Sequence, residues 1–383
     1  MEKNILYITN YYLEDVVQER KSQRLISQAG QNKSKYIIDV LEKSGNNVTV
    51  LSNAWAIDGK FHKSFQSNID GRVIYSGILG IPIITVISCY LSGRRILRRL
   101  ERKRKIDAIV FYNMRLENSL LVMYAKRKYS TKLVLQFEDG MSLDNNINPI
   151  KRFIYRKLEK RILKKIDAAF LVNSKIKVEC PSLVIRGAIR NSSTGIFFGK
   201  QQEVPKILFA STLDEQRGSK VLLESLDYIK TPFELIITGK GECADLFVNC
   251  KDPRVKFRGF LSYNEYTEEL EKSDICINAQ LTKKEFGNFS FPSKIYEYIS
   301  ARKIVVSSDV ADAESAVGDV AFIYHNDSPI NLAKALEQAI DMLHNKEEYT
   351  ELNKKIDKFI DENSLKNVSK KVDDFLEMVI NNR

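Results

Sequence analysis

The sequence predicts an α/β protein built from two doubly wound, Rossmann-like domains. Short runs of β-branched and other apolar residues alternate with stretches of helical spacing along most of the 383-residue chain, a pattern typical of parallel sheets covered by helices. The polar segment 190–204 interrupts this alternation, which then starts again. The chain is also longer than one ordinary domain. We therefore expect domains over residues 1–195 and 196–364, followed by a helical segment at 365–383.

Composition limits the class of protein. The chain is 44% hydrophobic and 28% charged, which is typical of a globular protein. Its formal net charge of +11 indicates anionic partners, which could be polyanions, membranes or charged substrates. Five cysteines without a C-x-x-C spacing and three scattered histidines favour reduced packing thiols and no metal site. The first residues enter a strand-like run without a signal-peptide pattern, so we expect a cytoplasmic protein.

The N-terminal half opens with a strand, a loop, a helix and a second strand. Residues 4–10 and 47–52 predict buried strands, and Gly45 ends the helix between them. The segment AGQNKS (29–34) is expected to be the loop before that helix. This order is typical of the start of a doubly wound sheet, and the segment could be a plain connecting loop.

Residues 73–93 contain no charged side chain. Their length would permit a membrane-spanning helix, but the glycines, serines and Pro82 within them favour a strand, a loop and a helix from about Pro82. That helix continues into residues 94–105, which include eight basic residues and one acidic residue. A second predicted helix, at 151–166, again has eight basic residues and one acidic residue.

An apolar half joined to a basic half is typical of helices that lie on anionic lipid. The alternative for either helix is a solvated basic face over an ordinary core stripe, such as the apolar residues of 151–166 that recur at helical spacing. Two such helices in one domain favour peripheral contact with an anionic membrane. Nucleic-acid binding is the weaker hypothesis, because no recognition motif accompanies the charge.

Two further strands, at 107–113 and 132–140, end in polar residues. Glu138 and Asp139 follow the second strand at its carboxyl end, where parallel sheets hold their ligands. Either carboxylate could orient or deprotonate a substrate hydroxyl. The alternative is that Asp139 and the glycine after it form only a turn. Strands at 168–174 and 182–189 complete this half.

The second half repeats the α/β pattern. A strand at 206–212 is followed by a turn containing Arg217 and Gly218 and by a helix that begins near Lys220. A strand at 233–242 ends in a glycine turn, and residues 255–278 predict strand, helix and strand. A final strand at 321–327 precedes an amphipathic helix. Each glycine turn could face a ligand or could only end a strand.

The stretch from 285 to 309 predicts loop, helix and strand. Ser293 is expected to cap a helix from about Lys294 to Ala301, and the run IVVSS (304–308) predicts a buried strand. Lys294 would add a positive charge to the helix start, which suits a phosphate. Glu297, one turn further along the same face, could accept two hydrogen bonds from a vicinal diol. These groups suit the diphosphate and ribose of a nucleotide, whereas the alternative is an ordinary helix with solvated side chains.

The segment FPSKIYEYISARKIVVSSD resembles the donor-binding segment of GT-B glycosyltransferases, in particular family 4 and the group 1 enzymes that assemble capsular and exopolysaccharides. The resemblance implies that Glu297 holds the ribose. The family's second glutamate, eight residues earlier, is replaced by Phe289, and Glu285 or backbone groups of the loop could take its place. This departure leaves the donor sugar open.

The segment LDEQRGSK resembles the phosphate loop of the same family. Arg217 and Gly218 stand where a lysine and a glycine are usual, and Thr212 stands where an arginine is usual. Lys220 or Lys294 could replace the missing charge. An arginine is suited to phosphate binding because it can donate two parallel hydrogen bonds to one phosphate.

The resemblance implies a GT-B fold with two Rossmann-like domains facing a cleft, and a C-terminal helix that packs back on the N-terminal domain. It also implies that the donor site takes its residues from several loops. The predicted donor-binding residues are Gly30, Thr212, Arg217, Gly218, Lys220, Gly239, Gly259, Phe260, Phe289, Ser290, Pro292, Ser293, Lys294 and Glu297. The predicted catalytic residues are Glu138, Asp139 and Glu285.

The implied function is transfer of a hexose, with retention of configuration, from a nucleoside-diphosphate sugar to a polyprenyl-linked or oligosaccharide acceptor in bacterial surface polysaccharide synthesis. The nucleotide sugar is a co-substrate, and neither a cofactor nor a metal is expected, which agrees with the lack of a D-x-D triplet. The expected location is the inner face of the cell membrane. The alternatives are a GT-B sugar-nucleotide epimerase and a catalytically degenerate nucleotide- or membrane-binding scaffold.

Overall fold

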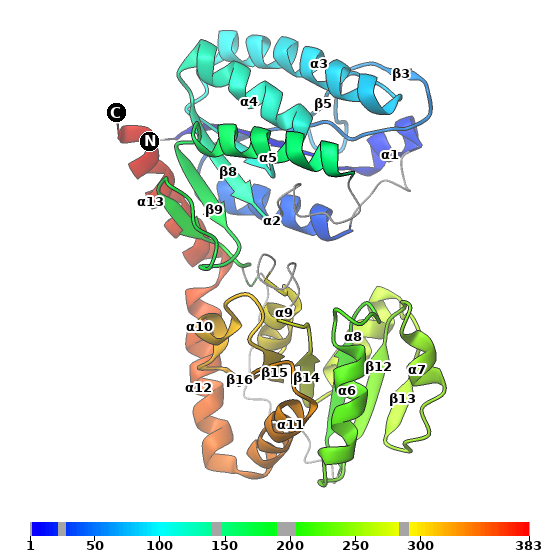
Figure 1. Ribbon diagram of the computed structural model, residues 1–383. Coiled ribbons are helices and arrows are strands. Elements are labelled where there is room, and N and C mark those ends of the chain that lie inside the picture. Colours follow the sequence, from blue (N-terminus) through cyan, green and yellow to red (C-terminus); the bar gives the residue numbers. More distant parts are fainter. Residues whose placement is uncertain are drawn as a thin grey trace. The chain divides into compact units, whose positions relative to one another are not determined.

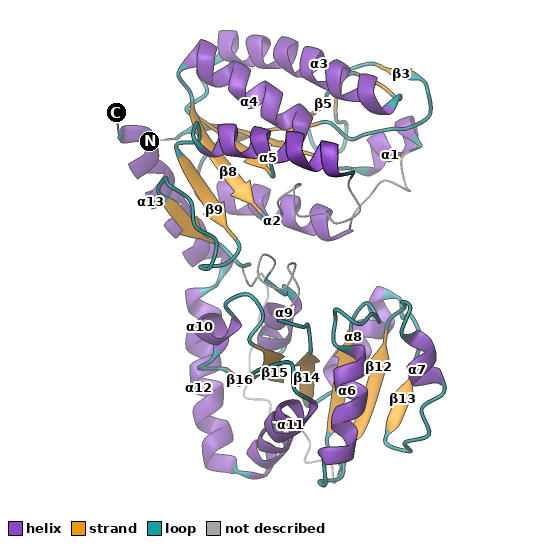
Figure 2. Ribbon diagram, in the orientation of Figure 1, coloured by secondary structure: helices purple, strands orange, loops and turns teal. Residues whose placement is uncertain are grey.

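The structure is a computed structural model that describes residues 2–21, 28–138, 148–187, 189, 204–282 and 291–382 (Figure 1). The chain divides into two compact units. Unit 1 comprises Met1–Ile185 together with Leu365–Arg383, and unit 2 comprises Arg186–Ser364. The boundary expected after residue 195 falls among residues that the structure does not describe. Each unit contains a sheet whose strands are all or mostly parallel, with helices on its faces (Figure 2), so the predicted α/β class with two Rossmann-like domains is confirmed.

The sheet of unit 1 has eight strands in the order β10-β9-β8-β7-β1-β2-β5-β4. All neighbouring pairs are parallel except β4 with β5. The strands are β1 (Asn4–Thr9), β2 (Asn47–Ser52), β4 (Phe65–Gln66), β5 (Val73–Tyr75), β7 (Ala108–Tyr112), β8 (Lys132–Phe137), β9 (Ala168–Leu171) and β10 (Ser182–Val184). A separate antiparallel pair is formed by β3 (Phe61–His62) and β6 (Ile78–Leu79).

Helices cover both faces of this sheet. They are α1 (Glu14–Arg20), α2 (Gln28–Lys43), α3 (Pro82–Lys103), α4 (Leu116–Tyr129), α5 (Pro149–Leu163) and α13 (Leu365–Asn381). Right-handed crossovers place α3, α4 and α5 on one face and α2 on the other, where α13 packs beside α2 (Figure 1). Lys3 Nζ lies 2.8 Å from Asp373 Oδ1, which fixes the final helix to the start of β1.

The residues expected to form a loop before α2 are helical. α2 already begins at Gln28, so Gly30 lies inside its first turn and not in a glycine loop. The polar side chains of this segment form hydrogen bonds with residues at the end of β1. They therefore do not take hydrogen-bonding groups of their own helix backbone. Gln31 Nε2 donates to the Asn10 carbonyl at 3.2 Å, and the hydroxyls of Ser34 and Thr9 lie 2.7 Å apart. These contacts explain why a turn-like composition continues a helix.

The second basic helix, α5, is only partly anchored in the core. The helix ends at Leu163, short of the predicted residue 166. Ile162 within it and Ile166 after it are buried, but Phe153 and Ile154 are 58% and 54% exposed. The apolar stripe of this helix therefore continues onto the surface over its first half. In the part of the chain that the structure describes, no helix is both long and apolar enough to span a membrane.

The sheet of unit 2 is entirely parallel, with six strands in the order β13-β12-β11-β14-β15-β16. The strands are β11 (Lys206–Ala210), β12 (Glu234–Thr238), β13 (Val255–Phe257), β14 (Ile275–Asn278), β15 (Ile304–Ser308) and β16 (Ala321–Tyr324). The chain moves from β11 through β12 to the edge at β13 and then returns to the other side of β11. This reversal makes the carboxyl ends of β11 and β14 the topological switch point, where doubly wound sheets bind ligands.

The helices of unit 2 are α6 (Ser219–Ser225), α7 (Ala244–Val248), α8 (Tyr263–Lys272), α9 (Lys294–Ser300), α10 (Ala313–Val317), α11 (Pro329–His344) and α12 (Lys346–Glu362). α12 was not predicted from the sequence, and it buries Tyr349, Ile356 and Ile360 against the core of unit 2. Leu365, directly after this unit, begins the helix that belongs to unit 1.

Candidate functional site

A cavity of about 210 Å³ opens at the switch point of unit 2. Its walls come from the carboxyl ends of β11 and β14, the loop after β11, and the start of α9. The lining residues are Phe209, Ala210, Ser211, Thr212, Arg217, Ile277, Asn278, Pro292, Ser293, Lys294 and Tyr298. Five of them were predicted from the sequence as donor-binding residues: Thr212, Arg217, Pro292, Ser293 and Lys294. The cavity therefore brings together predicted residues that lie up to 82 positions apart in the chain (212 to 294).

The loop carrying Arg217 is fixed to the end of β14. Gly218 has a φ of 80°, and a Cβ at this position would lie 1.9 Å from the carbonyl oxygen of Ala279, so only glycine fits this close approach. The backbone N–H of Leu281 donates to the carbonyl of Gln216 at 2.8 Å. The loop and the strand end are thus held together on both sides of Arg217.

The guanidinium of Arg217 has a buried partner. Its Nη1 donates to Gln280 Oε1 at 2.6 Å, and Gln280 is only 2% exposed. The carbonyl of Gln280 in turn accepts from the hydroxyl of Ser308 at the end of β15, 2.5 Å away. One donor of the guanidinium is therefore used for positioning, while the guanidinium still lines the cavity. This arrangement presents a fixed cation to a ligand.

Lys294 supplies a second cation to the cavity. Its Nζ lies 4.6 Å from the ring centroid of Tyr266 on α8. Burial lowers the pKa of Lys294, and the nearby Glu297 carboxylate opposes this shift. Burial also raises the pKa of Glu297, which Lys294 opposes in turn. The two side chains are therefore close and share a partly desolvated environment, as their spacing of one helical turn predicts.

The start of α9 differs from the prediction in one respect. Ser293 occupies the N-cap position, but its backbone is already helical (φ −60°, ψ −24°) and its side chain makes no capping hydrogen bond. The predicted Ser293 cap is wrong because the turn begins one residue earlier, where the Pro292 carbonyl accepts from the Ile295 N–H at 3.2 Å. Ser293 belongs to the cavity lining.

The turns at Gly239 and Gly259, two of the predicted donor-binding residues, lie side by side at the carboxyl ends of the strands. Gly239 has a φ of 145°, and a Cβ there would lie 1.9 Å from the Ser211 carbonyl oxygen. Its N–H donates to the carbonyl of Gly259 at 2.8 Å. The ends of β11, β12 and β13 are thereby packed backbone to backbone. Phe260, which follows, is exposed, and Lys240 Nζ lies 4.6 Å from its ring centroid.

Several other predicted residues lie outside the cavity lining. Lys220 is exposed and lies 3.9 Å from Glu215, so its side chain is directed to a surface ion pair. Glu297 lies beside Lys294 but does not itself line the cavity. Gly30 lies in unit 1. The predicted residues Asp139, Glu285, Phe289 and Ser290 fall outside the described residues.

Ser211 and Asn278, which line the cavity at the ends of the two central strands, were not predicted from the sequence. Gln280, which accepts a hydrogen bond from Arg217, was not predicted either. The strand predictions could have located the first two, because both follow or end a buried run at the switch point. Asn278 Nδ2 donates to Ser307 Oγ at 2.9 Å, which ties β14 to β15 beside the cavity. Nothing in the local sequence distinguishes Gln280.

Glu138 lies at the end of β8 in unit 1, where it was expected. Its Oε2 lies 3.3 Å from Lys33 Nζ, and its Oε1 accepts from Gln136 Nε2 at 3.1 Å. Its backbone N–H donates to Asn113 Oδ1, beyond the end of β7, at 2.8 Å. The carboxylate is thus oriented by Gln136 of its own strand and by Lys33 of α2, while Asn113 holds the backbone of Glu138. This placement is compatible with binding a hydroxyl-rich ligand.

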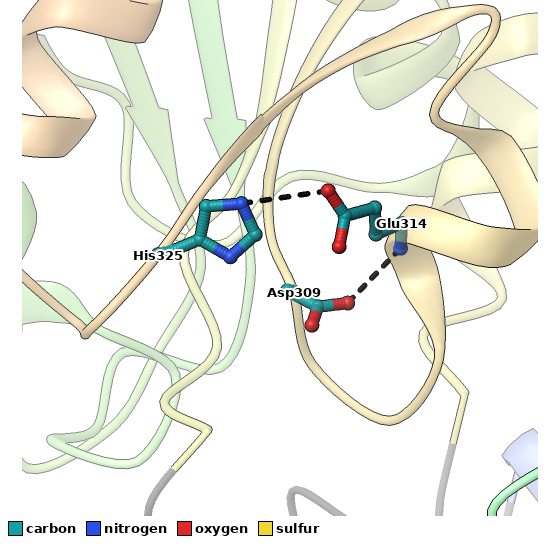
Figure 3. A group of neighbouring side chains, drawn as sticks. All are labelled: Asp309, Glu314 and His325. Atoms are coloured by element: carbon teal, nitrogen blue, oxygen red, sulfur yellow. Dashed lines mark hydrogen bonds and ion pairs between the residues drawn. The ribbon is translucent and has the colours of Figure 1, made fainter.

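The described residues also include a group with the chemistry of metal ligands, formed by Asp309, Glu314 and His325 (Figure 3). Their potential ligand atoms lie within 4.8 Å of one another. The N–H of Glu314 donates to Asp309 Oδ1 at 3.0 Å, and Glu314 Oε1 lies 3.6 Å from His325 Nε2. A helix-start hydrogen bond and a surface ion pair explain this proximity, so we assign no metal to it.

Solved structures of similar architecture identify the fold. HepE from Anabaena, in complex with UDP, has a TM-score of 0.68 at 12% identity, covering 98% of this chain and 100% of that chain. A sucrose-phosphate synthase from Thermosynechococcus elongatus has a TM-score of 0.67 at 12% identity, covering 99% of both chains. The apo form of the lipopolysaccharide outer core galactosyltransferase WaaB has a TM-score of 0.66 at 13% identity, covering 98% and 99%. The chain therefore has the GT-B fold.

Part of the chain also matches a family model. Residues 204–342 match the model of the family described as glycosyl transferases group 1, so the resemblance noted in the sequence is confirmed over this segment. The segment contains the whole cavity lining of unit 2. No curated protein sequence matches the chain. The family match and the fold together indicate that this protein is a glycosyltransferase.

Proposed function

We propose that the protein transfers a hexose from a nucleoside-diphosphate sugar to a polyprenyl-linked or oligosaccharide acceptor in bacterial surface polysaccharide synthesis, with retention of anomeric configuration. The observation that carries this proposal is the cavity at the switch point of unit 2, which Arg217 and Lys294 line with two cations. A diphosphate carries the complementary charge, and its binding would offset the partial burial of Lys294. The complex of the structurally similar HepE with UDP makes UDP the first nucleotide to test.

The chemistry proposed for this site depends on the leaving group. The bond between the sugar's anomeric carbon and the diphosphate oxygen breaks, and its electron pair goes to the diphosphate. Arg217 and Lys294 would stabilise the charge that develops there, which is the step that electrostatic preorganisation accelerates. An acceptor hydroxyl would attack from the same face and pass its proton to the departing phosphate oxygen. This route needs neither a metal nor a separate general base on the protein.

The first prediction concerns nucleotide binding. Among UDP, GDP, ADP and CMP, we expect one diphosphate to raise the thermal unfolding midpoint, because a ligand that binds only the folded state adds about 2.7 kcal/mol at a hundredfold excess over Kd. Differential scanning fluorimetry measures this shift. The variant Lys294→Met should lose it, because the cavity then keeps only Arg217 as a cation. If no diphosphate shifts the midpoint at millimolar concentration, the donor site is refuted.

The second prediction concerns pH. Burial lowers the pKa of Lys294 in the free protein, and a bound diphosphate should raise it again because anionic oxygens stabilise the ammonium. Nucleotide binding should then take up protons between the two pKa values, and the affinity should fall as the pH rises through that interval, by up to about tenfold per pH unit. Titration calorimetry in two buffers of different ionisation enthalpy measures the uptake. Equal pH slopes in wild type and Lys294→Met would contradict this role.

We further propose that the protein contacts the inner face of the cell membrane through unit 1. The two basic helices α3 and α5 lie on the same face of its sheet, and both expose apolar side chains beside their basic residues. On α5 these are Ile150, Phe153 and Ile154. Exposed apolar groups next to lysines and arginines suit the boundary between headgroups and acyl chains of an anionic bilayer.

The alternative of a degenerate nucleotide-binding scaffold is favoured by one observation. Thr212 lines the cavity where the resembling family usually has an arginine, so the diphosphate meets one cation fewer at that position. An assay for slow hydrolysis of the donor without acceptor separates the two functions. The scaffold would bind the nucleotide without releasing the sugar, whereas the transferase should release it.

A further inference from the structure

We propose that the groove between α3 and the β3–β6 pair of unit 1 binds the phosphate group of an anionic membrane lipid. The inference rests on the membrane contact proposed above and adds a defined site to it. Its basis is a cavity of about 460 Å³ whose lining residues all lie within the described part of the chain. They are Phe61, Lys63, Ser64, Gly77, Ser88, Leu91, Ser92, Arg95, Ile96 and Arg99.

The exposed face of α3 is apolar in its first half and basic in its second half. Its first half exposes Ile83 at 79%, Ile87 at 52% and Leu91 at 45%. From Arg95 onward the exposed positions of the same helix are basic. The spacing of four residues puts Ile87, Leu91 and Arg95 on one line along the helix. A contiguous exposed apolar stripe of this kind is uncommon on a soluble surface and marks an interaction site.

The groove lies where this stripe turns from apolar to basic. Leu91 and Arg95 belong both to the stripe and to the lining of the groove. Phe61, which is 67% exposed, contributes the opposite wall together with Lys63. The site therefore has three cations, Lys63, Arg95 and Arg99, next to apolar side chains that point to solvent. The described lining residues include no carboxylate to neutralise these cations.

Hydrogen bonds keep the groove in shape. The hydroxyl of Ser92 accepts from the Gly77 N–H at 2.7 Å, and the hydroxyl of Ser88 accepts from the Leu79 N–H at 3.0 Å. Both serines lie on α3, so they fix the strand segment of 77–79 against the helix. A Cβ at Gly77 would lie 3.2 Å from the Ser64 backbone nitrogen, which shows how tightly the segments approach. The cations are consequently presented by anchored elements.

Charge and hydrophobicity together identify the ligand class. A lipid phosphodiester would be held by Lys63, Arg95 and Arg99, since arginine and lysine both bind phosphate oxygens. Its acyl chains would continue along the apolar stripe beside Phe61 and Leu91. A free phosphate or a soluble sugar phosphate would use the cations only and would leave the stripe exposed. The arrangement therefore fits a lipid in a bilayer surface.

Vesicle binding tests this site with a matched control. The variant Arg95→Glu/Arg99→Glu changes two groove cations, and Lys103→Glu/Lys105→Glu makes the same change of net charge at exposed positions outside the groove lining. We expect the groove variant to lose at least about tenfold more affinity than the control for vesicles of phosphatidylglycerol and phosphatidylcholine in a sedimentation assay. Lys63→Glu, a change in a loop, should show the same trend without altering α3.

Each outcome is informative. Equal losses in the groove and control variants would overturn the lipid site, while the general membrane contact would stand. No binding of the wild type to these vesicles would overturn both. If inorganic phosphate, at a concentration equal to that of the lipid headgroups, displaces the protein from the vesicles, the groove is an ion site and the lipid assignment is overturned. An unchanged thermal shift with nucleotide in the groove variants would show that unit 2 is intact, so a failure of the donor-site proposal is recognised separately.

Discussion

Arg217→Ala is expected to lower the rate of sugar transfer at least about tenfold, equivalent to about 1.4 kcal/mol of transition-state stabilisation. The guanidinium lines the cavity and is aimed by its hydrogen bond to Gln280 Oε1 at 2.6 Å. If a diphosphate leaves from this cavity, its growing negative charge interacts with Arg217 more strongly in the transition state than in the ground state. The loss should therefore appear in kcat as well as in donor affinity.

Transfer assays with the nucleotide sugar selected by thermal shift measure this effect. Lys334→Ala is a control that removes one exposed positive charge from α11, which does not line the cavity, and it should transfer at the wild-type rate. Gln280→Leu keeps Arg217 but removes its buried acceptor, so a smaller loss is expected. Glu297→Ala should also lose about tenfold or more if its carboxylate holds the ribose. Wild-type rates in both Arg217→Ala and Glu297→Ala would refute the assigned site.

Many strands could be predicted from the sequence, because a strand that is buried on both faces is a continuous apolar run. The runs NVTVLS and IVVSS coincide with β2 and β15 as the structure has them. Parallel strands covered on both sides are continuous β-branched or apolar runs, and the chain offers few other ways to bury them. The position of each strand within its sheet, and with it the switch point, was not predicted, because such runs locate strands along the chain but do not identify their neighbours.

Side-chain hydrogen bonds between distant segments could not be predicted. The segment AGQNKS has turn-like composition, yet it is helical because Gln31 and Ser34 bond to the end of β1. Ser293 has the right residue type for a cap, but a turn closed by Pro292 makes that cap unnecessary. In both segments the local preference of the residues, for a turn or for a cap, was overridden by a hydrogen bond that the local sequence does not identify.

The residues of the candidate site also divide into those that the local sequence identifies and those that only the fold identifies. Arg217 and Lys294 could be predicted from their loops and from a family resemblance, and both line the cavity. Gln280 was missed because its role depends on the fold that brings the end of β14 to the loop after β11. The burial of the first half of α5 could not be predicted either. Helical periodicity indicates an apolar stripe but does not show whether other residues cover it.

Arg20→Met is expected to cost unit 1 about 3–5 kcal/mol of unfolding free energy. Arg20 lies at the end of α1 and is 1% exposed. Its Nη1 donates to the carbonyls of Asn53 and Ala54 at 2.7 and 2.6 Å, and its Nη2 donates to the carbonyl of Ser76 at 2.7 Å. One side chain thus joins α1 to the segments that follow β2 and β5.

Methionine fills similar volume without any donor, so three buried carbonyls would lose their partner, at about 1–3 kcal/mol for each group left unsatisfied. Arg104→Met removes the same charge from a side chain that is exposed and pairs with Glu2 only at 3.4 Å, and it should change stability by less than about 0.5 kcal/mol. Urea unfolding followed by tryptophan fluorescence reports on unit 1, because Trp55 is the only tryptophan in the chain and follows Ala54 directly. Equal midpoints for the two variants would mean that water or rearranged backbone replaces the arginine, whereas a large shift confined to Arg20→Met would identify this side chain as the link that holds the strand ends of unit 1 in place.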